Sequence, residues 1–392
     1  MKLRRFQDVD VAGRTALVRV DYNVPLEEGK ISDDERLVAS LPTLEYLVDH
    51  DAKVVLISHL GRPEGRVVGE LRLTPIAERL CELLGKSVRK LDDCVGREVS
   101  EAVSAGDPGD VYLLENVRFH QEEMLNDATF AKDLARLGDL FVNDAFATIH
   151  RAHASTVGVA EHLPAYAGFL VQREMTALSR LLQDPARPYI AVVGGKKAGS
   201  KLGALRDLVF RVDEVLVGGG VAFTFLAAVG ERVGDSEVDE ELYDEVREIR
   251  SLAEERGVRI SLPVDVVAAT AFSAESPSDT FEIGAIPDGW RGLDVGPKTV
   301  SLFRERILAA KTLVWTGPLG AYELAPFSAG TKRIGEAVAE SSAFSVIGGG
   351  ETGEAVKRFG LAGRVSYIST GGGACLAVLR GKTLPALEVL QD

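Results

Sequence analysis

Short runs of β-branched residues alternate with amphipathic helical stretches along the whole chain, and this alternation restricts the fold more than any other feature. A strand, a helix and a second strand form a βαβ unit, which builds parallel sheets covered by helices. We therefore expect an α/β fold with mostly parallel sheets. The expected strands are residues 15–21, 53–58, 110–114, 139–143, 189–193, 214–217, 259–262, 312–315, 343–347 and 364–368.

The length of the chain predicts more than one hydrophobic core. Domains usually contain about 100–200 residues, so a chain of 392 residues is expected to form two. Helical patterns lie between the strands. At Thr74 we expect an N-cap, followed by Pro75 at the first helical position, and Gly257 is expected to stop a helix over residues 238–256.

Charge and composition exclude several classes of protein. With 45 Lys and Arg against 59 Asp and Glu, the net charge is −14, which disfavours nucleic acid or an anionic membrane as a partner. The longest uncharged stretch, residues 215–230, is shorter than the roughly 20 apolar residues of a membrane span. The three cysteines are widely spaced, and the N-terminus lacks the pattern of a secretion signal. We expect a soluble cytoplasmic protein.

Glycine and proline gather where the expected strands end. In open parallel sheets, ligands bind at the carboxyl ends of the strands, and glycine lets backbone N–H groups approach an anion. Loops of this kind are often rich in glycine without a ligand, but their number here favours phosphate binding. The clusters are residues 23–25, 61–63, 194–195, 218–220, 317–318, 348–350 and 371–373.

In the first half, the strand ends carry side chains suited to an anion. The arginine fork matches carboxylate and phosphate oxygens, so several arginines at successive strand ends indicate a small polyanionic substrate. All six histidines are also in this half, and His150 and His153 have no cysteine partner at zinc-ligand spacing. The candidate anion-binding residues are Asp21, Asn23, Arg36, His59, Arg62, Arg118, His150 and Arg151.

The second half has glycine loops and a few lysines, which favour a nucleotide. After Gly194 and Gly199 the order Ser200-Lys201 is the reverse of a P-loop, so that motif fails. Residues 348–353 match the dinucleotide fingerprint, but no acidic residue follows the next strand to hold a ribose. A dinucleotide-dependent oxidoreductase is therefore the weaker alternative.

Seven longer strings, taken together, resemble phosphoglycerate kinase and occur in that family's order. They are residues 19–25 (RVDYNVP), 58–63 (SHLGRP), 114–119 (LENVRF), 141–146 (FVNDAF), 150–155 (HRAHAS), 293–297 (LDVGP) and 369–374 (STGGGA). The resemblance implies reversible phosphoryl transfer from 1,3-bisphosphoglycerate to ADP with Mg²⁺, giving 3-phosphoglycerate and ATP in glycolysis and gluconeogenesis. It also implies a monomer.

The resemblance further implies two Rossmann-like three-layer αβα domains that face each other across a hinged cleft. Residues 1–168 with 383–392 would bind phosphoglycerate, residues 169–182 would form the linking helix, and residues 183–382 would bind the nucleotide. The implied substrate residues are Asp21, Asn23, Arg36, His59, Arg62, Arg118 and Arg151. The implied nucleotide residues are Lys197, Lys201, Gly292, Glu323, Gly350, Glu351, Thr352 and Gly353, with Glu351 at the metal. The implied catalytic residues are Arg36, Lys197, Gly349 and Gly372.

The nucleotide half departs from the family pattern at several side chains. The family usually has alanine at the position of Lys196, aspartate at Ser200 and Glu351, and asparagine at Thr316. In the first half, Ala147 and Ile149 replace the usual small residues before His150. The departures concern metal geometry and nucleotide affinity, and leave two interpretations: drift in a working enzyme, or a degenerate paralogue that acts as a binding or regulatory protein.

Overall fold

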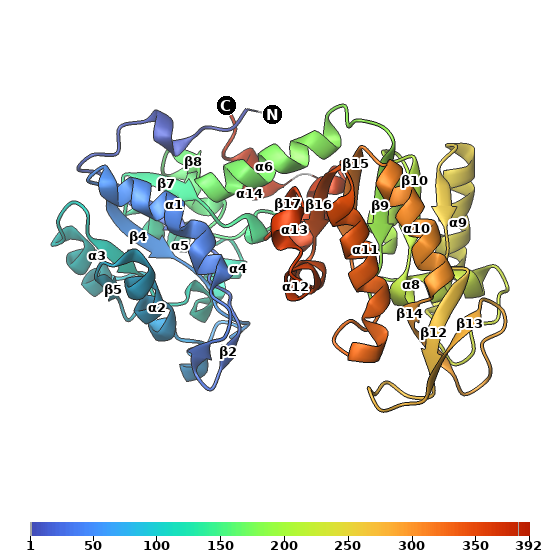
Figure 1. Ribbon diagram of the computed structural model, residues 1–392. Coiled ribbons are helices and arrows are strands. Elements are labelled where there is room, and N and C mark those ends of the chain that lie inside the picture. Colours follow the sequence, from blue (N-terminus) through green and yellow to red (C-terminus); the bar gives the residue numbers. More distant parts are fainter. Residues whose placement is uncertain (1, 383) are drawn as a thin grey trace. The chain divides into compact units, whose positions relative to one another are not determined.

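Two six-stranded sheets form the framework of the chain, and every strand pair in both is parallel (Figure 1). The structure is a computed structural model that describes residues 2–382 and 384–392. In spatial order, the first sheet contains β5 (Val88–Lys90), β6 (Val111–Leu113), β4 (Lys53–Ile57), β1 (Thr15–Arg19), β7 (Leu140–Asn143) and β8 (Ala165–Ala167). The second contains β11 (Arg259–Ser261), β10 (Glu214–Val217), β9 (Tyr189–Val193), β15 (Thr312–Thr316), β16 (Phe344–Gly348) and β17 (Tyr367–Ile368). The predicted α/β class with parallel sheets is confirmed.

The central strands are buried on both faces, as parallel sheets covered by helices require. Every residue of β9 and β15 is buried, and β4 is exposed only partly at its first residue. The α-helices of the described residues are α1 (Glu35–Asp49), α2 (Thr74–Leu84), α3 (Arg97–Ser104), α4 (Gln121–Met124), α5 (Ala128–Ala135), α6 (Phe169–Leu182), α7 (Leu202–Leu208), α8 (Gly219–Ala228), α9 (Tyr243–Glu255), α10 (Pro297–Ala309), α11 (Ala329–Glu340), α12 (Gly350–Arg358), α13 (Gly373–Leu379) and α14 (Pro385–Glu388).

The chain divides into two compact units, and the division falls inside α6. The first unit comprises Met1–Thr176 and Thr383–Asp392, and the second comprises Ala177–Lys382. Residues 1 and 383, at which two of the expected domain segments begin, lie outside the described residues. Within the first unit the two ends of the chain lie side by side (Figure 1), because the N–H of Arg4 donates to the carbonyl of Leu390 at 2.8 Å.

All ten predicted strands are present, although some are shorter than expected. The strand expected at residues 364–368 is reduced to β17, because a 3₁₀ turn at Ala362–Arg364 takes up its start. The sequence analysis missed the short edge strands β5 and β8 and the hairpin β2 (Leu26–Glu27) with β3 (Lys30–Ile31). It also missed a three-stranded antiparallel sheet, β13 (Ser278–Glu282), β12 (Asp265–Ala269) and β14 (Arg291–Val295).

The helix boundaries differ from the expectation by one or a few residues. The N-cap of α2 is Leu73, so Thr74 is already helical and Pro75 lies in the first turn. The helix expected over residues 238–256 begins as a 3₁₀ turn at Glu240–Leu242 and continues as α9. Gly257 follows it with a φ of +68°, a left-handed conformation that ends helices.

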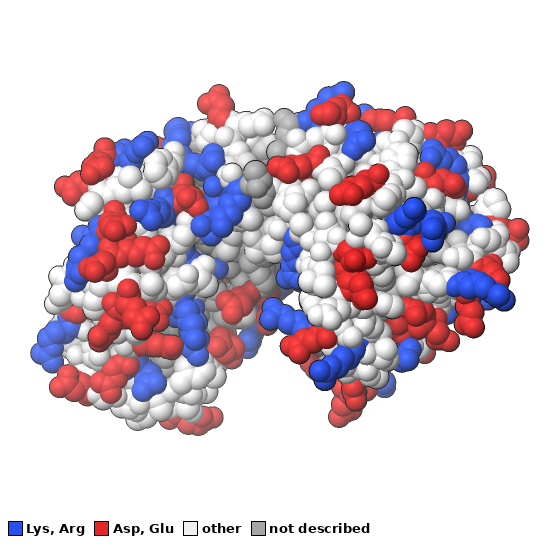
Figure 2. Space-filling model, turned by 180° about the vertical axis from the view of Figure 1, so that it is seen from behind, with Lys and Arg blue, Asp and Glu red and all other residues white. Residues whose placement is uncertain are grey.

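Charged side chains of both signs are interspersed over the face shown in Figure 2. This mixture agrees with a chain whose acidic excess is spread over many residues. Among the described residues, no helix combines the length and the apolar character that crossing a bilayer requires.

Candidate active site

The topology of each large sheet provides a place for a ligand. Beside β1 lie β4 on one side and β7 on the other, and beside β9 lie β10 and β15. In such sheets the loops that leave neighbouring strands in opposite directions open a crevice at the strands' carboxyl ends. We therefore describe the side chains at these two edges, one unit at a time.

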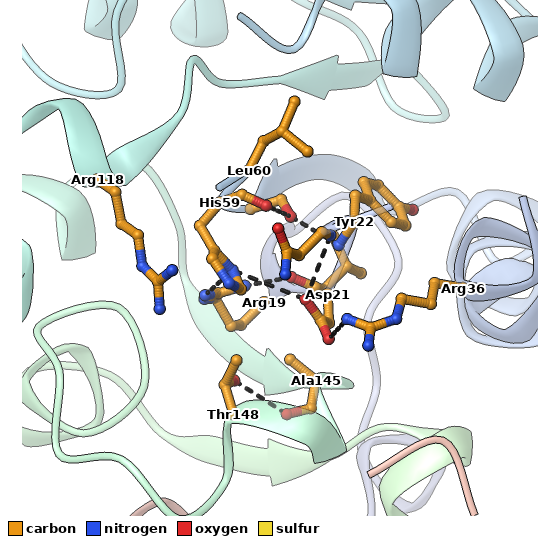
Figure 3. A network of polar contacts seen from close by, with 12 residues as sticks. Arg19, Asp21, Tyr22, Arg36, His59, Leu60, Arg118, Ala145 and Thr148 are labelled. Carbon is orange, nitrogen blue, oxygen red and sulfur yellow. Dashed lines mark hydrogen bonds and ion pairs between the residues drawn. The ribbon is translucent and has the colours of Figure 1, made fainter. Parts of the chain in front are cut away.

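In the first unit, Asp21 is the centre of a polar network that follows β1. Its carboxylate forms an ion pair with Arg36, which lies in the first turn of α1. Figure 3 shows Asp21 between Arg36 and His59, with Arg118 beyond His59 in this view. Two residues further on, Asn23 accepts a hydrogen bond from the N–H of Gly61 at 2.8 Å and so connects the loop after β1 to the loop after β4.

His59 is buried in this network and is held as a neutral imidazole. Its Nδ1 lies 3.1 Å from Nη2 of Arg19 and 3.7 Å from Oδ1 of Asp21. The pKa of His59 lies well below its ordinary value, first because of burial and then because of the positive charges of Arg19, Arg118, Arg151 and Arg36. Since the Arg19 guanidinium can only donate, Nδ1 accepts, and Nε2 carries the proton.

Buried hydrogen-bond donors without a partner lie in the same unit. Arg118 donates from Nη1 to the carbonyl of Gly61 at 2.7 Å, whereas its buried Nε has no partner among the described residues. The same holds for Nδ2 of Asn143, at the end of β7. Burial, followed by the charges of Arg151 and Arg19, lowers the pKa of Arg118 to about 10. Buried donors in proteins nearly always have a hydrogen-bond partner, so the unpartnered donors of Arg118 and Asn143 are suited to bind an anion.

The other predicted substrate residues are more exposed. Arg151 is half-buried, and its Nε lies 3.4 Å from Nε2 of His150. The Nδ1 atom of His150 is buried without a partner in the described part of the chain, and burial lowers the pKa of its ring. Arg62 lies three residues after His59 and is exposed.

Arg19 is a residue of this network that the sequence analysis missed. It is the last residue of β1, is 1% exposed, and donates from Nε to Oγ of Ser155 at 2.8 Å. Ser155 in turn donates to Oε1 of the buried Glu123 at 2.6 Å, and His153 lies 3.6 Å from the same carboxylate oxygen. These contacts hold Arg19 in place next to the ring of His59. The sequence feature that could have identified Arg19 is an arginine at the end of an otherwise mostly apolar strand.

In the second unit, a cavity of about 430 Å³ lies at the carboxyl ends of β9, β10 and β15. Three of the predicted nucleotide residues, Gly292, Glu323 and Glu351, line it, as does the additional cation Lys196. Much of the remaining lining is apolar or is glycine backbone: Gly195, Gly219, Gly220, Phe223, Pro263, Val266, Phe272, Leu293, Val295, Pro318, Leu319 and Gly320.

Close backbone approach explains the glycines at two of these loops. A Cβ on Gly194 would lie 2.2 Å from the carbonyl oxygen of Pro318. A Cβ on Gly317 would lie 2.1 Å from the carbonyl oxygen of Gly194, and Gly317 has a φ of +84°. The loops after β9 and β15 can therefore pack against each other only without side chains at these positions.

The two predicted lysines have different surroundings. Lys201 is partly buried, and its Nζ donates to Oγ1 of Thr316 at 3.2 Å. Burial lowers the pKa of Lys201, while the nearby carboxylate of Glu351 acts in the opposite direction. Lys197 is exposed, and Ser200 donates to its carbonyl at 3.1 Å.

The predicted phosphate loop leads from β16 into α12. Gly349 is the N-cap of α12 with a φ of +104°, and Glu351 is exposed in the first turn. Thr352 is buried, and its Oγ1 accepts a hydrogen bond from the N–H of Gly317 at 2.6 Å. A second short helix, α13, has Gly372 as its N-cap with a φ of +39°.

Comparison with known proteins decides which family has this arrangement. Residues 6–382 match the family model described as Phosphoglycerate kinase. The chain belongs to the phosphoglycerate kinase family. It is therefore a phosphotransferase that acts on a carboxyl group, and the substrates of its family are phosphoglycerate and ADP or ATP.

Relatives and solved structures of phosphoglycerate kinases agree over nearly the whole chain. The phosphoglycerate kinase of Moorella thermoacetica is 48% identical over 386 residues, and that of Dictyoglomus turgidum is 49% identical over 387; each alignment covers 98% of both chains. The structure of phosphoglycerate kinase from Coxiella burnetii has a TM-score of 0.90 at 40% identity and covers 99% of this chain and 98% of that one. The enzyme from Pyrococcus horikoshii has a TM-score of 0.87 at 34% identity, with the same coverage.

Asp294 is a second residue of the kinase fold that the sequence analysis did not select. It lies in β14, lines the cavity, and is 3% exposed. Its Oδ2 accepts from the N–H of Gly330 at 2.7 Å and its Oδ1 accepts from the N–H of Val295 at 2.9 Å. Burial raises the pKa of Asp294 to about 7, although these two hydrogen bonds act to lower it.

A raised carboxyl pKa makes stability fall as pH rises. Between the ordinary value of 3.8 and about 7, the folded chain holds a proton at Asp294 that the unfolded chain has lost. The free energy of unfolding should therefore decrease with pH over that window, by up to about 1.4 kcal/mol per pH unit from this group. Asp294→Asn should remove this contribution.

Urea denaturation at a series of pH values measures the effect. Tryptophan fluorescence reports the second unit, because both tryptophans of the chain, Trp290 and Trp315, lie in it. Asp288→Asn, at an exposed carboxylate paired with Arg232, is the matched control and should keep the slope of the unsubstituted protein. Equal slopes in both variants would contradict the assignment.

Proposed function

We propose that this chain transfers a phosphoryl group reversibly between 1,3-bisphosphoglycerate and ADP, giving 3-phosphoglycerate and ATP. The observation that carries the proposal is the group of cations and unpartnered donors around the neutral His59. That group offers several positive charges and few counter-charges, which suits a small molecule bearing both carboxylate and phosphate. Family membership supplies the second substrate, the nucleotide.

The reaction needs positioning and neutralisation of charge, and no general base. The attacking oxygen, on a carboxylate or on the terminal phosphate of ADP, is already ionised near neutral pH. In the forward direction, the terminal phosphate oxygen of ADP forms a bond to the phosphorus of the acyl phosphate. The bond from that phosphorus to the acyl oxygen breaks, and this oxygen leaves with the electron pair as part of a carboxylate. In-line geometry and donors aimed at the transferred group then supply the rate.

The residues of the first unit have distinct proposed roles. Arg118, His59, Arg62 and Arg151 would bind the phosphate and carboxylate of phosphoglycerate, with Asn23 shaping the loop between them. Asp21 would orient Arg36 through their ion pair, and Arg36 would neutralise charge on the phosphoryl group in transfer. His59 would act as a donor through Nε2, which its lowered pKa supports.

The residues of the second unit would hold the nucleotide. The apolar part of the cavity, near Gly292, suits a base, and Glu323 would accept hydrogen bonds from the ribose. Lys201 and the backbone of Gly350, Thr352 and Gly353 would contact the phosphates, since anions are stabilised at helix N-termini. Lys197, with the backbone of Gly349 and Gly372, would stabilise the transferred group.

The donor set around Glu351 fits Mg²⁺. This cation prefers oxygen ligands and usually binds through one or two carboxylates together with substrate phosphates. Glu351 offers one exposed carboxylate at the lining of the cavity and close to Lys201. We propose that Glu351 holds Mg²⁺, which would neutralise charge on the nucleotide phosphates when bound.

We also propose that the two units close around their substrates and that the enzyme acts as a monomer. The residues proposed for phosphoglycerate lie in one unit and those proposed for the nucleotide lie in the other, so the proposed transfer requires both units to meet the same phosphoryl group. Closure would also exclude water, which competes for the acyl phosphate. The division inside α6 supports this helix as the link between the units.

Phosphoryl transfer from MgATP to 3-phosphoglycerate tests the function directly. The acyl phosphate formed is consumed in a coupled reductive step, and ATP is compared with GTP across a magnesium titration. Turnover would support the kinase and show that Lys196, Thr316 and Glu351 are tolerated. A folded protein that binds phosphoglycerate without turnover would favour the degenerate paralogue, which the similarity to named kinases along the whole chain disfavours.

Arg36→Ala should lower kcat by about 10²–10³-fold while 3-phosphoglycerate binding remains measurable. The proposed role of Arg36 is exerted mainly in the transition state, where removal of one preorganised donor costs this much. Steady-state kinetics and calorimetric titration with 3-phosphoglycerate separate the two effects. Arg79→Ala is the control, because Arg79 pairs with Asp34 and Glu82 at the surface. Full activity of Arg36→Ala would contradict the assignment.

Glu351→Ala should raise the magnesium concentration needed for half-maximal rate by at least about tenfold, as for other groups around bound metals. Glu351→Asp should keep or improve the apparent magnesium affinity, since it retains the carboxylate. Glu354→Ala, at an exposed glutamate of the same helix, is the control. If Glu351→Ala leaves the magnesium dependence unchanged, Glu351 is not a metal ligand.

A further inference from the structure

Three side chains with different metal-binding atoms meet in the first unit, at residues to which the proposed phosphoryl transfer gives no role. Asp93 and Cys94 lie in the loop between β5 and α3, and His120 is the N-cap of α4. One carboxylate oxygen, the thiol sulfur and one imidazole nitrogen all lie within 4.8 Å of one another. The two loops come from different parts of the sequence, so the fold brings these atoms together.

The ligand set is the one that zinc takes in proteins. Zn²⁺ binds thiolate, imidazole and carboxylate at about 2.0–2.3 Å, whereas Mg²⁺ avoids sulfur and nitrogen. Small rotations of the side chains would bring three atoms with the observed spacing to these bond lengths. A three-residue set leaves a fourth tetrahedral position for water.

The structure holds these side chains in place and leaves a path for an ion. The N–H of Cys94 donates to Oδ1 of Asp93 at 2.7 Å, and the ring of His120 stacks on Phe130 with centroids 5.1 Å apart. Asp93 and His120 are 53% and 29% exposed at their side chains, while Cys94 is buried. An ion can therefore approach from solvent through the two polar residues and meet a sulfur behind them.

Two of the three side chains are in direct contact with each other. Nε2 of His120 lies 2.7 Å from Oδ1 of Asp93, an ion pair when the ring is protonated. Surface pairs of this kind contribute little to stability, about 0–1 kcal/mol. Zinc binding would break only this weak contact while it forms three metal–ligand bonds. The ion pair between Asp93 and His120 does not involve the thiol of Cys94.

We propose that Asp93, Cys94 and His120 bind one zinc ion per chain, with water as the fourth ligand. On binding, the proton of the Cys94 thiol and any proton at the zinc-binding nitrogen of His120 pass to the buffer as the sulfur–zinc and nitrogen–zinc bonds form, and no electron is transferred. His120 follows Arg118 by two residues, so the ion would restrain the segment that carries this arginine. The site is separate from the proposed Mg²⁺ ligand Glu351, which lies in the other unit.

Calorimetric titration of the purified full chain with ZnCl₂, without nucleotide or phosphoglycerate and with excess Mg²⁺ present, tests the proposal. We expect one zinc per chain and at least about tenfold weaker binding in His120→Gln, Asp93→Asn and Cys94→Ser. Cys81→Ser and His162→Gln should bind as the unsubstituted protein does, because the half-buried Cys81 and the exposed His162 do not belong to the group of three metal-binding side chains. Co²⁺ used as a probe should give a thiolate charge-transfer band that Cys94→Ser lacks.

Two results would overturn the zinc site. One is the absence of stoichiometric binding by the unsubstituted protein. The other is binding that persists unchanged in His120→Gln and Asp93→Asn, whose part-exposed side chains make misfolding a poor explanation even if Cys94→Ser fails to fold. Both results are independent of phosphoryl transfer activity, so failure of this site and failure of the proposed function are distinguishable.

Discussion

The parallel direction of the strands in each large sheet is the constraint on which the functional surfaces depend. All carboxyl ends of a parallel sheet lie at one edge, so loops far apart in the sequence become neighbours there. The register pairs Arg19 with Ile57 on one side and with Asn143 on the other. The residues that follow these strands, Asp21, His59 and the segment after Asn143, are therefore adjacent although more than a hundred positions separate the first from the last. Burial of the strands on both faces keeps this edge in place, because sliding a strand would expose its apolar side chains.

Positive charge concentrated at this edge is unfavourable in the free protein and useful for binding an anion. A buried charge loses hydration and needs a partner. Glu123 supports Arg19 through Ser155, and Asp21 pairs with Arg36. At Arg118 the positive charges of Arg151 and Arg19 act more strongly than the negative charges of Glu123 and Asp21. The pKa of Arg118 and of His59 is lowered first by burial and then by repulsion from neighbouring positive charges. A bound phosphate or carboxylate would relieve it, so the arrangement gives up some stability of the fold in favour of affinity for an anion, a frequent feature of functional sites.

The sequence predicted the central strands well, because their signal is local. β9 and β10 have the expected bounds, since continuous runs of apolar and β-branched residues between turn residues mark a buried strand. β13 has the sequence SDTFE and is mostly exposed, so only its pairing with β12 makes it a strand. The same difference between local signals and long-range contacts holds for the residues of the candidate active site. Asp21 and His59 were selected from strings around them, whereas the roles of Arg19 and Asp294 depend on contacts with residues such as Ser155 and Gly330, which no local pattern contains.

The two units differ in the kind of group that could contact an anion. In the first unit the donors are side chains such as Arg118, so a substitution removes the interaction itself. In the second unit the loops after β9 and β15 pack against each other through Gly194 and Gly317. A backbone N–H group that contacts an anion in such a loop would not be removed by a neighbouring side-chain substitution. Thr316 stands where the family usually has asparagine, yet its hydroxyl still accepts from Lys201 at 3.2 Å. The departures from the family pattern at Ser200, Thr316 and Glu351 all fall in this unit.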